Sequence, residues 1–229
     1  MAPQLSIPAE KIRLIVFDLD GTLIDSRKDL VTSINAMLLE FNRQPLPEEI
    51  IAEYIGDGAG MLVRRALGDP DDEKLVESAL TSFLNHYREH KLDHTYVYDG
   101  VFAALDALKD GRQMAVLTNK PVVPAKAICD ALGLSPYFFR IYGGYSFSTK
   151  KPDPEGLTTL IREAGVEPDE TVMVGDSDVD ILTARRAKTW IIGCRYGLSP
   201  HTVECIPSDY LADSPKDWIS ALDTAKIKK

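Results

Sequence analysis

The chain has 229 residues, of which 45% are hydrophobic and 27% charged, a balance typical of an ordinary soluble globular protein. No apolar stretch approaches the ~18 residues that a membrane-spanning helix needs, and a net charge of −9 argues against nucleic acid as a partner. Residues 1–8 lack the basic start and apolar block of a signal peptide, and the three cysteines lack metal-ligand spacing. We therefore expect a cytoplasmic protein with reduced thiols, a loose N-terminal extension and no membrane contact.

The first predicted element is a buried strand over residues 14–17, which Asp18-Leu19-Asp20-Gly21 follows directly. Because strand side chains alternate between two faces, Asp18 and Asp20 are expected to project together from the carboxyl end of this strand. Two crowded carboxylates repel each other unless a cation or a shared proton is present. The pair therefore predicts a metal site, although the short pattern taken alone is better explained by a tight Asp-Gly turn.

The next part of the chain, up to about residue 96, contains no convincing strand and predicts helices. Ser26 and Asp29 form a candidate capping box, and apolar residues at helical spacing follow it. A later long helix carries Phe83 and Tyr87 among its apolar positions. The expected helices beyond the first cover residues 47–55, 61–67 and 71–91. This block interrupts the chain after its first strand, and the predicted division is a core of residues 1–24 and 98–229 with an inserted helical cap, residues 25–97.

Strand-like and helix-like segments alternate from about residue 97 onward. The expected strands cover residues 114–117, 140–142, 171–174 and 190–192. The expected helices cover residues 123–132, 155–164 and 178–187. Such alternation predicts parallel strands with helices on both faces of the sheet. The expected fold class is therefore α/β, with a doubly wound, Rossmann-like parallel-sheet core and the inserted α-helical cap.

Three further polar clusters follow predicted strands. Thr118-Asn119 comes after the second strand, Lys151 lies in the loop after the third, and Asp176 and Asp180 follow the fourth. Each has an ordinary explanation alone, as a turn, a solvated lysine or the capping box of the next helix. In a parallel sheet, however, these loops gather at one edge. The clusters can therefore converge with the first pair of carboxylates.

Together the four clusters resemble the four motifs of the haloacid dehalogenase superfamily, in order and in spacing. The resemblance covers residues from about 14 to 197, and the insert resembles the helical cap class of that superfamily. Within the insert, residues 54–59 and 61–67 resemble the phosphoglycolate phosphatase branch. The helix after Asp180 departs from the pattern, because it ends in Arg185-Arg186-Ala187-Lys188 where family members often have a glycine.

The resemblance implies phosphoryl transfer through an aspartyl-phosphate. Asp18 is the expected nucleophile, and Asp20 is the expected general acid and base. The expected cofactor is Mg²⁺, which Asp18, the backbone carbonyl of Asp20 and Asp176 would hold. Charge favours a metal independently, because these aspartates and Asp180 outnumber Lys151 before a dianionic phosphate arrives.

The remaining motif residues are expected to handle the phosphate. The resemblance assigns the Thr118 hydroxyl and the Asn119 backbone N–H to phosphate oxygens, and Lys151 to the charge that develops on the phosphoryl group. Asp180, one helical turn beyond Asp176, is expected to orient Lys151 or a water on the metal.

The expected activity is hydrolysis of a small phosphorylated carboxylic acid, with 2-phosphoglycolate first. A sugar phosphomutase on the same scaffold is the second possibility, and a non-enzymatic phosphoacceptor signalling domain is the alternative from another class. A dehalogenase is disfavoured, because Asp20 resembles the phosphotransfer branch. Both a monomer and a homodimer stay open.

Two features of the insert are candidates for substrate recognition. Gly56-Asp57-Gly58 is either a specificity loop or a flexible turn between cap helices. Arg64 or Arg65 either meets a substrate carboxylate or is a solvated helix arginine.

Overall fold

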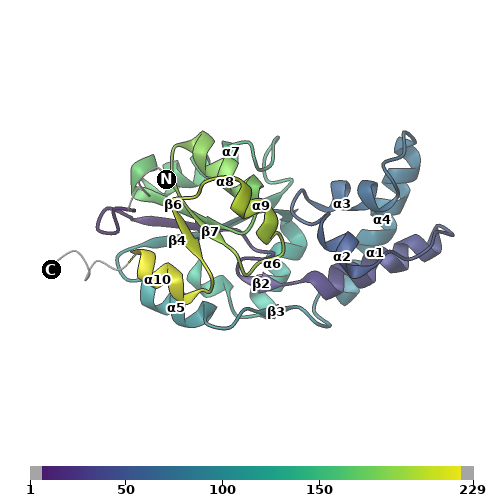
Figure 1. The fold of residues 1–229 in the computed structure, drawn as a ribbon, viewed down its shortest axis with the longest axis horizontal. Helices are drawn as coiled ribbons and strands as arrows, with labels where there is room; N and C mark the ends of the chain where they lie inside the picture. Colours follow the sequence, from purple (N-terminus) through teal and green to yellow (C-terminus); the bar gives the residue numbers. More distant parts are fainter. Residues whose placement is uncertain (1–6, 223–229) are drawn as a thin grey trace.

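The computed structural model describes residues 7–222, so part of the predicted N-terminal extension, residues 1–6, lies outside the described residues. Its centre is a six-stranded sheet in the order β5-β4-β1-β6-β7-β8 (Figure 1). Every neighbouring pair in this sheet is parallel, which confirms the predicted α/β class. The strands are β1 (Leu14–Phe17), β4 (Gln113–Pro121), β5 (Arg140–Gly144), β6 (Thr171–Gly175), β7 (Trp190–Cys194) and β8 (Tyr210–Ala212).

The central strand β1 is buried on both faces because helices cover each side of the sheet. Ile15 and Phe17 pack into one apolar cluster with residues of α5, α6 and α10, whereas Leu14 and Val16 pack into a second with residues of α7 and α8. This alternation is what a strand between two helical layers requires. The core helices are α5 (Val101–Leu108), α6 (Val122–Ala131), α7 (Glu155–Ala164), α8 (Asp178–Ala187), α9 (Pro200–Cys205) and α10 (Lys216–Leu222).

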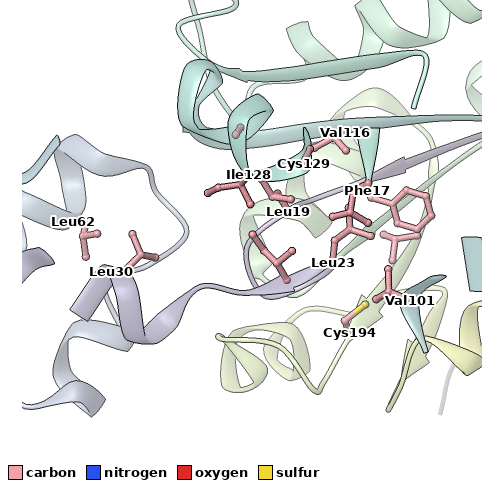
Figure 2. Packing of buried hydrophobic residues seen from close by; sticks show 14 of the residues in the cluster. Phe17, Leu19, Leu23, Leu30, Leu62, Val101, Val116, Ile128, Cys129 and Cys194 are labelled. Atoms are coloured by element: carbon pink, nitrogen blue, oxygen red, sulfur yellow. The ribbon is translucent and has the colours of Figure 1, made fainter. Parts of the chain in front are cut away.

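Four helices lie together beside the sheet rather than on it (Figure 1). They are α1 (Arg27–Glu40), α2 (Glu48–Ala52), α3 (Ala59–Ala66) and α4 (Glu73–His90). Figure 2 shows Leu30 and Leu62 in this helical group, apart from the apolar residues around Phe17. We call α1–α4 the cap. The division of the chain at residues 24/25 and 97/98 stays a prediction.

A short antiparallel pair that the sequence did not predict lies at the base of the cap. β2 (Ile24–Asp25) pairs with β3 (Tyr96–Val97), and residues 26–95 between the two strands contain no strand, as expected. Each strand has two residues, which is too short for a periodic signal. The pairing draws the two ends of the cap segment together.

The capping box predicted for Ser26 and Asp29 is wrong. Ser26 precedes α1 but makes no side-chain cap bond, because its hydroxyl donates to Asp20 Oδ1 at 2.5 Å. Asp29 Oδ2 instead accepts three hydrogen bonds from His94 N, Thr95 N and Thr95 Oγ1, at 3.0, 2.8 and 2.7 Å. Both side chains therefore serve tertiary contacts instead of the helix end.

Most other predicted boundaries agree closely with the structure, whereas α2 ends at Ala52 instead of at residue 55. Helices α7 and α8 begin and end where the sequence indicates, and Lys188 ends α8 in the left-handed conformation that glycine favours. Strand β4 continues through Thr118 and Asn119 to Pro121 instead of stopping before them. Among residues 7–222, no helix is long and apolar enough to cross a membrane.

Candidate active site

The carboxyl ends of β1, β4 and β6 meet at one edge of the sheet. Phe17 is in register with Val116 on one side and with Val174 on the other. The Asp18 backbone N–H donates to Val174 O at 2.9 Å, so the chain leaves β1 still held to β6. The predicted clusters therefore come together where the parallel strands end.

Asp18, Lys151 and Asp180 form one buried ionic group. Lys151 Nζ donates to Asp18 Oδ1 at 2.7 Å and to Asp180 Oδ1 at 2.6 Å. Burial and the neighbouring Asp180 and Asp20 raise the pKa of Asp18 to about 6, although Lys151 opposes the shift. Burial alone would lower the pKa of Lys151, but Asp18 and Asp180 outweigh it and raise the pKa above its ordinary value. The lysine is thus held as a cation against the Asp18 carboxylate.

Asp20 has a different set of partners from Asp18. Its Oδ1 accepts from Ser26 Oγ, and both carboxylate oxygens accept from Lys120 Nζ, at 2.9 and 3.1 Å. Lys120 is buried, and its Nζ lies 4.7 Å from the centre of the Tyr87 ring on α4. The sequence predicted no role for Lys120 and placed Tyr87 among the apolar core positions.

Asp176 lies in a tight backbone cradle. Its Oδ2 accepts from the backbone N–H groups of Leu198 and Ser199, at 2.7 and 3.3 Å. A Cβ built on Gly21, whose φ is +85°, or on Gly197 would overlap the Asp176 side chain. These glycines therefore leave room for the carboxylate beside the start of the Asp18–Asp20 loop. Burial, together with Asp18 and Asp180, raises the pKa of Asp176 well above its usual value.

These buried carboxylates fit a divalent cation. Single oxygens of Asp18, Asp176 and Asp180 lie within 4.8 Å of one another. Burial and the neighbouring carboxylates both raise the pKa values of Asp18 and Asp176, and a divalent ion bound between them would oppose both effects. Carboxylate oxygens are also the donors that hard cations such as Mg²⁺ prefer.

Asp180 combines the two roles that the sequence left open. Its Oδ2 accepts from Ser177 N and Ser177 Oγ, which completes the capping box of α8, while its Oδ1 accepts from Lys151. A Cβ on Gly175 would overlap this side chain. The capping bond therefore fixes the carboxylate that holds Lys151.

Thr118 and Asn119 line the same site from β4, and both are buried. The Thr118 hydroxyl oxygen accepts from the Lys120 backbone N–H at 3.2 Å. Asn119 Nδ2 donates to Lys151 O at 3.0 Å and to Gly56 O at 3.1 Å, so it links the loop that contains Lys151 to the cap. The Gly56-Asp57-Gly58 loop is held to the core again by Lys150 Nζ, which donates to Asp57 O at 2.6 Å.

The two cap arginines have acidic partners within the cap. Arg64 bonds Glu73 at 2.6 Å and lies 3.7 Å from Asp69, whereas Arg65 pairs with Asp57 at 2.5 Å. Neither arginine is among the described residues that line the cavity between core and cap. That cavity measures about 50 Å³, and Asp18 and Asp20 are both among the residues that line it.

The chain is similar to several known proteins. A relative from Rhodospirillum rubrum named phosphoglycolate phosphatase is 36% identical over 218 residues, which cover 90% of each chain. A relative of the same name from Pseudomonas putida is 42% identical over 83% of this chain and 72% of its own length. The crystal structure of a protein from Haemophilus somnus, described as a predicted phosphoglycolate phosphatase, matches with a TM-score of 0.85 and 31% identity, covering 96% of this chain and 99% of the other.

The family model for haloacid dehalogenase-like hydrolases matches residues 15–194, a span that includes all four polar clusters and the cap. The resemblance inferred from the motifs is thereby confirmed, and so is the hydrolase class. The chain belongs to the haloacid dehalogenase-like hydrolase family.

Proposed function

We propose that the protein is a Mg²⁺-dependent phosphatase that hydrolyses 2-phosphoglycolate to glycolate and phosphate. The observation that carries this proposal is the different surroundings of two carboxylates at one strand end. Asp18 is bonded to Lys151, whereas Asp20 is bonded to Ser26 and Lys120. Neighbouring carboxylates in different environments suit different steps of one reaction. The relatives named phosphoglycolate phosphatase support the choice of substrate.

Asp18 and Asp20 divide the proposed reaction between them. An Asp18 oxygen attacks phosphorus and forms an aspartyl-phosphate, while Asp20 gives its proton to the departing glycolate oxygen. Water then attacks the phosphorus, and Asp20 takes the proton of that water. Cleavage of the bond between phosphorus and Asp18 releases phosphate and restores both carboxyl groups.

The other site residues position and neutralise the phosphate. The Thr118 hydroxyl and the Asn119 backbone N–H hold its oxygens, and Lys151 offsets the charge that develops on it. Asp180 positions Lys151. Asp18, the Asp20 backbone carbonyl and Asp176 would hold Mg²⁺, which would supply further positive charge to the transition state.

The comparisons favour the hydrolase over a sugar phosphomutase. The relatives that are 36 and 42% identical to this chain are both named phosphoglycolate phosphatase.

A panel of phosphomonoesters with Mg²⁺ tests the proposal. We expect multiple turnovers with release of phosphate, and the highest kcat/KM for 2-phosphoglycolate. Isomerisation of a sugar phosphate would indicate the mutase, and a stable stoichiometric phosphoprotein would indicate a phosphoacceptor. Asp18→Asn should abolish turnover. Asp20→Asn should abolish turnover and keep Mg²⁺ affinity, which isothermal titration calorimetry measures, because the proposed metal contact is the backbone carbonyl.

A further inference from the structure

Lys120 places a buried positive charge in the cavity. Its side chain is only 3% exposed, and Asp20 accepts two of its three N–H donors. Among the described residues that line the cavity, Lys120 is the one cation. Lys151 is not among the described residues that line this cavity, and it bonds Asp18 and Asp180.

The cap side of the cavity is mostly apolar. Its lining residues from the cap include Leu30, Leu62, Phe83 and Leu84. An anionic group that entered such surroundings without a partner would lose its hydration and gain nothing in return. A substrate carboxylate therefore needs a cation inside the cavity, and Arg64 and Arg65 are paired elsewhere in the cap.

Tyr87 provides a second, independent indication of a ligand at this place. It lines the cavity and is 2% exposed, and its hydroxyl hydrogen has no acceptor among residues 7–222, since the neighbouring Lys120 ammonium can only donate to the hydroxyl oxygen. A buried hydroxyl without a partner costs free energy unless a ligand or water accepts its hydrogen. Burial raises the pKa of Tyr87 to about 12, so the hydroxyl stays a donor at neutral pH.

We propose that Lys120 Nζ and Tyr87 Oη together bind the carboxylate of the substrate, and that this contact makes the enzyme specific for short acid phosphates. The inference rests on the proposed phosphatase function and adds the residues that select the substrate. Lys120 comes from the core and Tyr87 from the cap, which lie against each other here. The carboxylate site is complete only when core and cap are in contact.

Substrate pairs that differ in the carboxylate test this proposal. The kcat/KM of the Mg²⁺-loaded enzyme is measured for 2-phosphoglycolate and for ethyl phosphate, which lacks the carboxylate. Lys120→Met should lower the ratio of the two values roughly 10- to 100-fold, and Tyr87→Phe should lower it roughly tenfold, because each removes a donor to a charged acceptor. Tyr98→Phe is the matched control, since the Tyr98 hydroxyl is also unpartnered among the described residues but does not line the cavity. Its ratio should not change.

A binding measurement separates recognition from catalysis. 3-Phosphonopropionate carries a carboxylate and propylphosphonate lacks it, so the two inhibitors differ in the same way as the two substrates. Their inhibition constants can be compared without turnover of either compound. We expect the preference for the carboxylated inhibitor to fall in Lys120→Met and Tyr87→Phe. If Lys120→Met lowered kcat/KM equally for both substrates, and lowered the affinity equally for both inhibitors, Lys120 would act only through Asp20. That result would overturn the proposal.

The two proposals can fail separately. If the protein released phosphate from many monoesters with no preference for a carboxylate, the proposed phosphatase activity would be supported. The proposed carboxylate site would be overturned. Absence of turnover on every monoester would overturn the proposed function, and the inhibitor pair would still decide whether Lys120 and Tyr87 bind a carboxylate.

Discussion

Replacing Asp18 by asparagine is expected to stabilise the metal-free protein while it removes the proposed nucleophile. Burial, with the nearby carboxylates of Asp180 and Asp20, raises the pKa of Asp18 from 3.8 to about 6. The folded protein then holds this proton more tightly than the unfolded chain does. Ionisation of Asp18 therefore lowers the free energy of unfolding as pH rises from about 4 to above 6.

The magnitude follows from the size of the pKa change. It corresponds to about 3 kcal/mol at pH 8 and about half of that at pH 5. An asparagine keeps an amide oxygen for the Lys151 ammonium and carries no charge, so Asp18→Asn should recover most of this free energy. The gain in stability should therefore be larger at pH 8 than at pH 5.

Urea unfolding in the presence of EDTA, at pH 5 and pH 8, measures both effects. Asp110→Asn is the control, because it removes one exposed carboxylate without the buried surroundings. Addition of Mg²⁺ should stabilise the wild-type protein more than the variant, since a divalent cation relieves the repulsion that the substitution has already removed. A variant less stable than wild type at pH 8, or a difference independent of pH, would refute the reasoning.

Substitutions at three further positions test the end of helix α8, the proposed metal site and the base of the cap. Lys188→Gly should raise stability by about 0.5–1 kcal/mol, because Lys188 has a φ of +61°, and Lys188→Ala should give no such gain in thermal unfolding. Gly21→Ala should weaken Mg²⁺ binding by calorimetry, since its Cβ would overlap the Asp176 carboxylate, and an unchanged affinity would contradict the proposed ligand. Asp29→Ala should lower stability in urea by about 3 kcal/mol, through three lost hydrogen bonds, whereas Asp29→Asn should lose less.

Sequence patterns predicted the fold best where local and tertiary requirements agree. Helix α8 has its capping box at the start, and α7 ends at Gly165 in the left-handed conformation, so local signals and packing give the same boundaries. At Ser26 they disagree. The residue has the type and spacing of a helix cap, but its hydroxyl donates a hydrogen bond to the carboxylate of Asp20 instead of capping α1. A local rule cannot anticipate a partner that the fold brings from another loop.

The candidate site shows the same limit more sharply. The motif residues were recognisable because each directly follows a strand, and the topology then brings the strand ends together. Lys120 also had a usable signal, since it lies only two residues beyond Thr118 in the sequence, and both residues line the same cavity. That signal became visible only with the full length of β4, which continues past the predicted end to Pro121.

Tyr87 had no such signal, because its spacing with Phe83 on α4 is that of an ordinary buried helix face. Its meaning comes from the contact between its ring and the Lys120 ammonium, a pairing of cap and core that neither pattern contains. The chemistry on phosphorus depends on residues that the sheet positions, and these are readable in sequence. In the proposed carboxylate site, the selection of the substrate depends on a contact between two parts of the fold. A protein with the same catalytic motifs and another residue in place of Tyr87 should therefore differ in its preference for the carboxylate.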